Sequence, residues 1–303
     1  MMVKLRKSCL NYSLLGLFLC IFTGCEQTFE PLQENDDLVF SMYGTVDVHG
    51  EFSTVRVMPI GKSLINRNPE PNGTKATLVH STTGNRISFR DSLFKFGGDA
   101  YVWNYLSEEE LEANNRYRFI AENPEGRFSY AQINLPSILP LPTVKEYNTG
   151  FESGIFNGES DDPIVSVKTR YIVQPTNELG CDPEVEVVIS HLDQLITYAD
   201  GSYRLVVNNR SEISAALGPS VDSFRTNRRE LLVISSGDDW PEIADLIELE
   251  SSMPDAVNNI NGGVGYVAGI AGRRIQITPP LEPCPQIWPK NISENMQDGN
   301  PGK

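Results

Sequence analysis

Two pairs of neighbouring aspartates are the residues of this chain best suited to acid–base chemistry. They are Asp161-Asp162 and Asp238-Asp239, and both pairs lie in polar segments. A glycoside hydrolase needs two carboxyl groups that face each other across about 5 to 10 Å. Sequence neighbours in a loop do not provide that geometry, because such side chains are usually solvated. Calcium binding by these oxygen-rich loops is an alternative, although the chain has no EF-hand spacing.

The other reactive side chains do not form a recognisable catalytic motif. The histidines His49, His80 and His191 are far apart in the sequence, and none has metal-ligand spacing with a cysteine. The chain contains no G-x-S-x-G, HExxH or CxxC motif. We therefore expect a protein that is not an enzyme, with no cofactor and no metal site.

A row of aromatic residues is the weak candidate for ligand binding. Tyr101, Trp103 and Tyr105 alternate along an expected strand, so their rings would share one face. Such a face could bind a sugar or a peptide. The alternative, which is the commoner outcome for large aromatic side chains, is that the three rings belong to the hydrophobic core.

The first 25 residues have the three zones of an exported precursor. Residues 4 to 7 carry three positive charges, and Leu14–Phe22 is apolar apart from Gly16. That run is too short to span a bilayer and has the length of a signal-peptide core. The following Phe22-Thr23-Gly24-Cys25 resembles the lipobox of bacterial lipoproteins, with Phe22 in place of the usual aliphatic residue. The alternatives are a signal peptide cut elsewhere and a short uncleaved anchor.

The lipobox resemblance implies that Cys25 is acylated and becomes the first residue of the mature chain. Each buried methylene contributes roughly 0.8 kcal/mol to membrane binding, so two or three acyl chains would attach the protein permanently. Residues 26–37 are polar and acidic, with too little apolar surface to fold. We expect a signal peptide at 1–24 and a lipidated acidic tether at 25–37.

The charge of the chain disfavours one class of partner. The formal net charge is −15, and it becomes −18 once the three bases of residues 1–24 are removed. Nucleic-acid binding needs clustered lysine and arginine, so we expect no nucleic-acid partner.

The cysteines predict one disulfide. After removal of residues 1–24 and acylation of Cys25, Cys181 and Cys284 are the two cysteines left, and an even pair in an oxidising compartment is expected to be bonded. Two unpaired thiols are the alternative.

The sequence pattern of the body of the chain predicts short strands separated by turns. The alternating runs at 45–48 and 54–57, with His49-Gly50 between them, predict a hairpin. About seven such runs predict an antiparallel sandwich of immunoglobulin or transthyretin-like kind at 38–136. The prolines of 135–143 favour a stiff connection, and 143–290 is expected to be a second β-rich domain. The tail 291–303 is expected to be disordered.

The second domain is less regular in its pattern. Strands are expected at 165–173, 184–189, 203–207, 231–235 and 264–277, whereas the glycine-rich stretch 148–162 is expected to be a loop. One amphipathic helix is expected after Asp239, because Trp240, Ile243, Ala244 and Ile247 have helical spacing.

The stretch from Asn258 to Gly269, followed by Arg273-Arg274-Ile275-Gln276-Ile277, carries a family resemblance. It resembles the C-terminal signature of exported Bacteroidota lipoproteins of the domain of unknown function 4249 (DUF 4249) type, with Val267 where an aromatic residue is common. The resemblance implies an association with TonB-dependent outer-membrane receptors and supplies no catalytic residues. The glycines of the stretch lack the spacing of a phosphate-binding loop and predict a tight turn and close strand packing.

These observations predict a lipid-anchored outer-membrane protein of the bacterial cell envelope, facing the periplasm or the cell surface. Its membrane contact would be the lipid on Cys25, and its expected partner is an outer-membrane transporter. The alternative is a structural or adhesion lipoprotein, and a carbohydrate-active hydrolase is a weaker one.

Overall fold

The computed structural model describes residues 37–61, 67–96, 100–145, 153–177, 180–219, 221, 223–237, 240 and 258–277. These residues are mostly β-structure, as the sequence predicted. No helix among them is long and apolar enough to cross a membrane. The segment 1–24 expected to be a signal peptide, Cys25 and the tail 291–303 lie outside the described residues.

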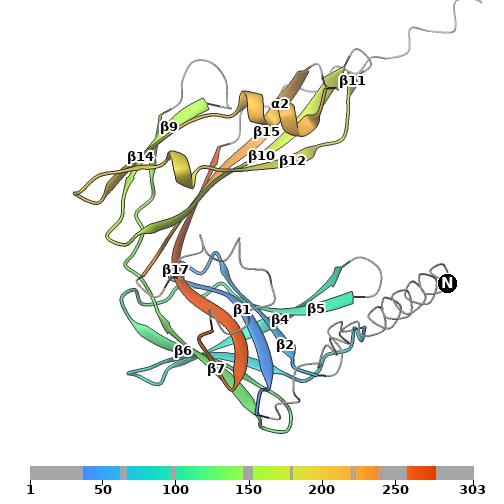
Figure 1. Cartoon of the computed structure of the whole chain (residues 1–303), viewed down its shortest axis with the longest axis vertical. Helices are drawn as coiled ribbons and strands as arrows, with labels where there is room; N and C mark the ends of the chain where they lie inside the picture. Colours follow the sequence, from blue (N-terminus) through green and yellow to red (C-terminus); the bar gives the residue numbers. More distant parts are fainter. Residues whose placement is uncertain are drawn as a thin grey trace, which may run out of the picture. The chain divides into compact units, whose positions relative to one another are not determined.

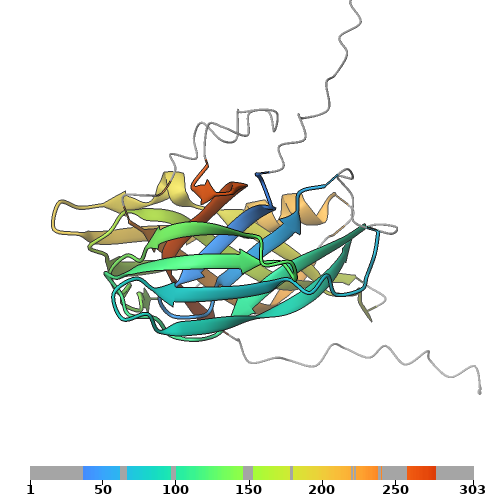
Figure 2. The same ribbon diagram turned by 90° about the horizontal axis from the view of Figure 1, so that it is seen from below.

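The first part of the body is a sandwich of two layers, as Figure 2 shows from below. Its strands are β1 (Phe40–Asp47), β2 (Ser53–Pro59), β3 (Lys75–His80), β4 (Arg86–Phe96), β5 (Ala100–Ser107), β6 (Arg116–Glu122) and β7 (Phe128–Asn134). One layer contains β1, β2 and β5, and the other contains β3, β6 and β7. Strand β4 joins both layers, because residues 86–89 pair with β3 and residues 90–96 pair with β5. The expected hairpin at 45–57 is confirmed as β1 and β2.

The strand β17 (Gly263–Ile277) is shared by the two parts of the body (Figure 1). Its first half, residues 263–270, pairs with β1 in parallel, and its second half, residues 270–277, pairs with β15 (Ser223–Ser236) in antiparallel. The sandwich is therefore mixed rather than purely antiparallel. The short β16 (Ile260–Asn261) precedes β17 and pairs with β7.

The glycines of β17 allow this close approach, as the sequence predicted. A Cβ on Gly265, whose φ is +116°, would overlap the carbonyl oxygen of Met42, and one on Gly269 would overlap that of Asn134. Gly262, at φ +68°, makes the turn before the strand. The Asn259 side chain fixes the same turn by bonding both the amide and the carbonyl of Val267, at 3.0 and 2.8 Å.

The second part contains two sheets and a helix, and most of its buried apolar residues belong to the same cluster as those of the sandwich. One sheet contains β10 (Ile164–Asn177), β11 (Gly180–Cys181), β12 (Val185–Ser190), β15 and the end of β17. The other contains β8 (Thr143–Lys145), β9 (Ser153–Glu159), β13 (Ile196–Thr197) and β14 (Ser202–Asn208) in the order β13-β14-β9-β8. A short 3-10 helix, η1 (Leu192–Gln194), precedes β13, and α2 (Arg210–Leu217) follows β14.

The structure corrects the sequence analysis of this part at one loop and one helix. The stretch 148–162 was expected to be a loop, yet β9 occupies 153–159, because Tyr203 on β14 covers Gly158 and replaces the side chain that the glycine lacks. The sequence analysis also missed α2, which places Ile213 in an apolar cluster with Tyr171, Val173 and Val187. The helix expected after Asp239 falls outside the described residues.

The carboxylate of Asp47 holds β17 where it passes from one partner strand to the other. Asp47 is fully buried at the end of β1. Its oxygens accept the amide hydrogens of His49 at 3.3 Å, Phe52 at 3.1 Å and Gly272 at 2.8 Å. The side chain thus joins the β1–β2 turn to a residue 225 positions further along the chain.

The connection at 135–142 is fastened to both parts of the body. Leu135 and Leu139 are buried, and these residues form no helix or strand. The amide of Ser137 donates to Asp162 Oδ2 at 2.7 Å, and Arg273 Nε of β17 donates to the carbonyl of Leu139 at 2.7 Å. The segment is therefore part of the packed structure.

Candidate functional site

A groove on the sheet β13-β14-β9-β8 is the candidate site that the described residues support best. Strand pairing aligns four residues across this sheet: Thr143, Asn157, Arg204 and Ile196. The next row contains Glu159 opposite Ser202. Directly paired residues point to the same face of a sheet, so these side chains form one surface. The opposite face carries Phe156, Tyr203, Leu205 and Val207, which are buried.

The groove has a volume of about 560 Å³, which lies within the range of roughly 300–1,000 Å³ typical of small-molecule sites. Its lining combines polar and apolar groups: Pro140, Leu141, Thr143, Asn157, Gly158, Glu159, Tyr198, Ser202, Tyr203 and Arg204. The apolar part is open to solvent, since Leu141 is 62% exposed and Tyr198 is 50% exposed. The ring of Tyr203 is buried on the opposite face of the sheet, and this burial raises the pKa of its phenol to about 12.

Thr143 Oγ1 donates to the carbonyl of Asn157 at 3.2 Å and Ser202 Oγ donates to Asp200 Oδ1 at 2.6 Å, but three other polar side chains of the groove lack partners within the described part of the chain. No hydrogen bond or ion pair there engages the side chains of Asn157, Glu159 or Arg204. Arg204 and Glu159 are exposed, and Asn157 is half-buried. The groove therefore presents an amide, a carboxylate and a guanidinium whose donors and acceptors are open to an added molecule.

A second polar face, formed by β12, β10 and β15, behaves differently. Arg170 donates to both oxygens of Glu186 at 2.8 Å and to Glu230 at 3.2 Å. Arg228 also contacts Glu230, at 3.4 Å. The charged groups of this face therefore pair with one another, and few of their donors and acceptors are available to a ligand.

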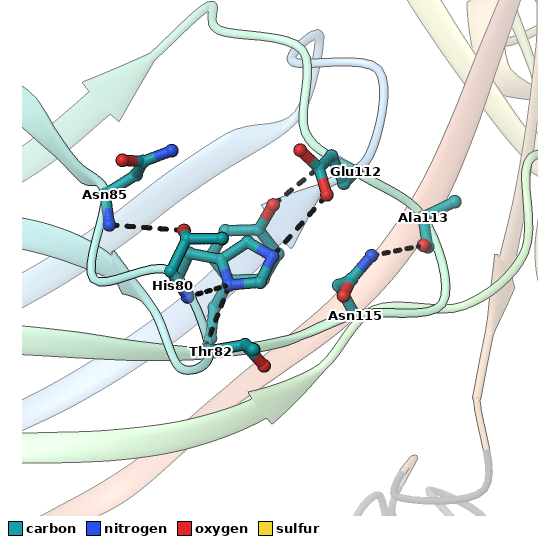
Figure 3. A network of polar contacts seen from close by, with 8 residues as sticks. His80, Thr82, Asn85, Glu112, Ala113 and Asn115 are labelled. Atoms are coloured by element: carbon teal, nitrogen blue, oxygen red, sulfur yellow. Dashed lines mark hydrogen bonds and ion pairs between the residues drawn. The ribbon is translucent and has the colours of Figure 1, made fainter.

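His80 lies in a polar network at the turn after β3 (Figure 3). Its Nδ1 accepts the amide hydrogens of Thr82 and Thr83 at 3.1 and 3.3 Å, so the proton of the neutral ring is on Nε2, which lies 3.5 Å from Glu112 Oε2. The amide of Glu112 donates to the Tyr117 hydroxyl at 3.1 Å. The ring is 5% exposed, so the network fastens a turn to a neighbouring loop rather than presenting a base to solvent.

His191 belongs to a second network, which is fully buried. Its Nε2 lies 2.7 Å from Thr169 Oγ1 and 3.1 Å from Asn209 Nδ2, and Asn209 also donates to the Tyr171 hydroxyl at 2.9 Å. Burial lowers the pKa of His191 from its ordinary value. These four side chains join β10, the end of β12 and the start of α2, so they stabilise the packing of this corner.

The aromatic row from the sequence analysis lies largely in the core. Trp103 and Tyr105 are 6% and 2% exposed, and both belong to the main apolar cluster. The Tyr105 hydroxyl donates to the carbonyl of Thr74 at 3.4 Å. Tyr101 is half-buried, with the Lys95 ammonium 5.8 Å from its ring centre. Trp103 and Tyr105 are therefore core residues, as the alternative in the sequence analysis predicted.

The other sequence candidates are dispersed. Asp162 accepts the Ser137 amide and thereby fixes the connection, while Asp161 is exposed; Asp238 and Asp239 lie outside the described residues. Cys181 pairs with Thr176 as part of β11, and Cys284 lies outside the described residues, so their disulfide stays a prediction. Within the described ranges, no three His, Cys, Asp or Glu residues form a group that could hold a metal ion.

The groove could not be found from sequence spacing. Thr143, Asn157 and Arg204 are contributed by three strands that span about 60 residues of the chain, and only their pairing brings them together.

Comparisons with known proteins reveal no family. No protein-family model matches the chain, and no curated protein matches it. A pullulanase from Anoxybacillus sp. LM18-11 in complex with maltotriose is 10% identical over 65% of this chain and 24% of that chain, with a TM-score of 0.22. Pullulanase type I from Bacillus subtilis str. 168 in complex with maltose is 10% identical over 66% and 23%, with a TM-score of 0.20. The chain spans about a quarter of the length of these structures, and TM-scores this low support no argument.

Proposed function

We propose that this protein is a non-catalytic, lipid-anchored binding protein of the bacterial outer membrane that serves as an accessory component of a TonB-dependent receptor-type uptake system. The observation that carries the proposal is the sequence pattern that ends at Cys25, with its charged, apolar and small-residue zones. The resemblance of residues 258–277 to exported DUF 4249 lipoproteins supports the link to a receptor.

The character of the groove supports binding rather than catalysis. Glu159 is the single carboxylate among the described residues of its lining, whereas hydrolysis of a glycosidic bond uses two. The structure also describes the neighbouring acids Asp161 and Asp162, and the Asp162 carboxylate accepts the amide hydrogen of Ser137. An exposed groove with open donors and acceptors is suited to reversible capture of a ligand before its transfer to a receptor.

Metabolic labelling tests the anchor. Cells that express the wild-type protein or Cys25→Ser are grown with an alkyne-tagged palmitate, and the protein is then isolated and fractionated. The wild type should carry the label and sediment with membranes, because several buried acyl chains hold it there. The Cys25→Ser protein should be unlabelled. Equal labelling of the two proteins, or a wild type free in the soluble fraction, contradicts the proposal.

Affinity capture tests the partner. The tagged wild-type protein is purified from detergent-extracted envelopes, and co-purifying proteins are identified by mass spectrometry. An outer-membrane receptor should be enriched relative to an unrelated tagged lipoprotein. Recovery of no receptor, together with a deletion strain that takes up nutrients normally but attaches differently to surfaces, would favour an adhesion role instead.

A further inference from the structure

We propose that the groove lined by Asn157, Glu159, Tyr198 and Arg204 binds a neutral oligosaccharide. The inference names the ligand class for the binding role proposed above and rests on that role, although its test does not need the lipid anchor. The juxtaposition of open planar polar groups with exposed apolar surface, on one face of one sheet, points to this class.

The polar groups of the groove match the chemistry of sugar hydroxyls. A hydroxyl both donates and accepts, and a sugar ring presents several in fixed directions. Asn157 offers two donors and an acceptor, Glu159 offers acceptors, and the Arg204 guanidinium offers a fork of donors. Strand pairing places Asn157 directly opposite Arg204, so the two planar groups can be bridged by neighbouring hydroxyls of one ring.

The apolar groups match the C–H faces of the same ligand. Tyr198 is half exposed next to this polar row, and its backbone is fixed by a hydrogen bond from its amide to the carbonyl of Ser202 at 2.8 Å. Pro140 and Leu141 line the groove with it. An aromatic ring with a held backbone forms a platform for stacking at low entropic cost.

The balance of charge favours a neutral ligand. Among the described residues that line the groove, Arg204 is the one cation and Glu159 the one anion, so a ligand of either sign meets repulsion as well as attraction. The strand edges disfavour an extended peptide. Recognition of a peptide by added strand pairing needs a long free edge, whereas β8 has three residues and β13 has two.

Calorimetry with a panel of hexasaccharides tests the proposal. The mature protein is extracted in a polyoxyethylene detergent, which has no sugar headgroup, and is titrated with millimolar maltohexaose, cellohexaose, xylohexaose and mannohexaose. Oligogalacturonate and chitosan hexamers provide anionic and cationic probes of the same length. At least one neutral hexasaccharide should bind, and it should bind more tightly than both charged probes.

Matched variants locate the site. Tyr198→Ala and Asn157→Ala should each weaken binding about tenfold, which is the effect of losing a stacking platform or a good hydrogen bond. Tyr43→Ala and Asn208→Ala remove the same residue types from exposed positions outside the groove and should leave affinity unchanged. All four positions are at least partly exposed, and equal melting temperatures verify folding.

The proposal is overturned if no neutral probe binds, if a charged probe binds best, or if the groove variants bind like the wild type. None of these results alters the labelling of Cys25 or the capture of a receptor, so failure of the ligand class is distinguishable from failure of the proposed function.

Discussion

Replacement of Asp47 by alanine should destabilise the protein strongly without touching its surface. The substitution removes a fully buried carboxylate that accepts three backbone amides, from His49, Phe52 and Gly272. A hydrogen bond to a charged group contributes about 1.5–3 kcal/mol, and a buried donor left without an acceptor costs about 1–3 kcal/mol. The Gly272 amide is buried, whereas water can reach the turn at 49–52 more easily.

We therefore expect Asp47→Ala to lower the free energy of unfolding by about 3–5 kcal/mol. For a chain of this size each kcal/mol changes the melting temperature by about 2–4 °C, which gives a decrease of roughly 6–20 °C. Asp47→Asn retains one acceptor oxygen and should lose less. Differential scanning calorimetry measures both effects, and Asp161→Ala, at an exposed turn position, serves as the matched control.

Hydrogen exchange tests the physical reason for this loss. If Asp47 fixes the passage of β17 from β1 to β15, the amide of Gly272 should exchange faster in Asp47→Ala than in the wild type. Amides of β3 and β6, which pair with each other in the other layer of the sandwich, should change less. A stability loss below about 1 kcal/mol, or unchanged protection at Gly272, would refute the reasoning.

Two further predictions concern β17 and the buried histidine. Gly265→Ala should cost more than about 3 kcal/mol in a urea titration, because the new Cβ overlaps Met42 at a φ of +116°, whereas Gly61→Ala, with open space around it, should be nearly neutral. His191→Gln should flatten the fall in melting temperature between about pH 7 and pH 5. Burial lowers the folded-state pKa of His191, so the unfolded chain binds the proton first and stability is lost as pH falls below the unfolded pKa of about 6.5. Burial also lowers the pKa of His49, so some slope remains in the variant; an unchanged slope would contradict the prediction.

Local hairpins were predictable because their signals are adjacent in the sequence. The alternation of Val55 and Val57 follows the turn at His49-Gly50, and the structure pairs these segments as β1 and β2. The glycines of 262–269 were also interpreted correctly as sites of a turn and of close packing. Their partner could not be inferred, because no periodicity reports that a strand near the end of the chain lies parallel to the first strand of the body.

The errors in the second part have identifiable physical causes. Gly154 and Gly158 indicated a loop, but glycine is tolerated in β9 because Tyr203 covers Gly158 from the paired strand. The helix α2 had signals of its own. Asn209 and Glu212 have the spacing of a capping box, and Gly218 follows the last turn at φ +87°. The Asn209 side chain nonetheless binds Thr169 and Tyr171 instead of capping, so tertiary bonding replaced the local role.

The connection at 135–142 both lines the groove and is hydrogen-bonded to β17. Its Pro140 and Leu141 line the groove, and the preceding Leu139 gives its carbonyl to Arg273 of β17. Asp47 binds the amide of Gly272, the neighbour of Arg273. A ligand that packs on Leu141 therefore contacts a segment that is hydrogen-bonded to β17, the strand shared by the two parts of the body. Because that segment is already buried at Leu139 and bonded at Ser137, the apolar wall of the groove is formed before a ligand arrives, and binding there need not pay to order it.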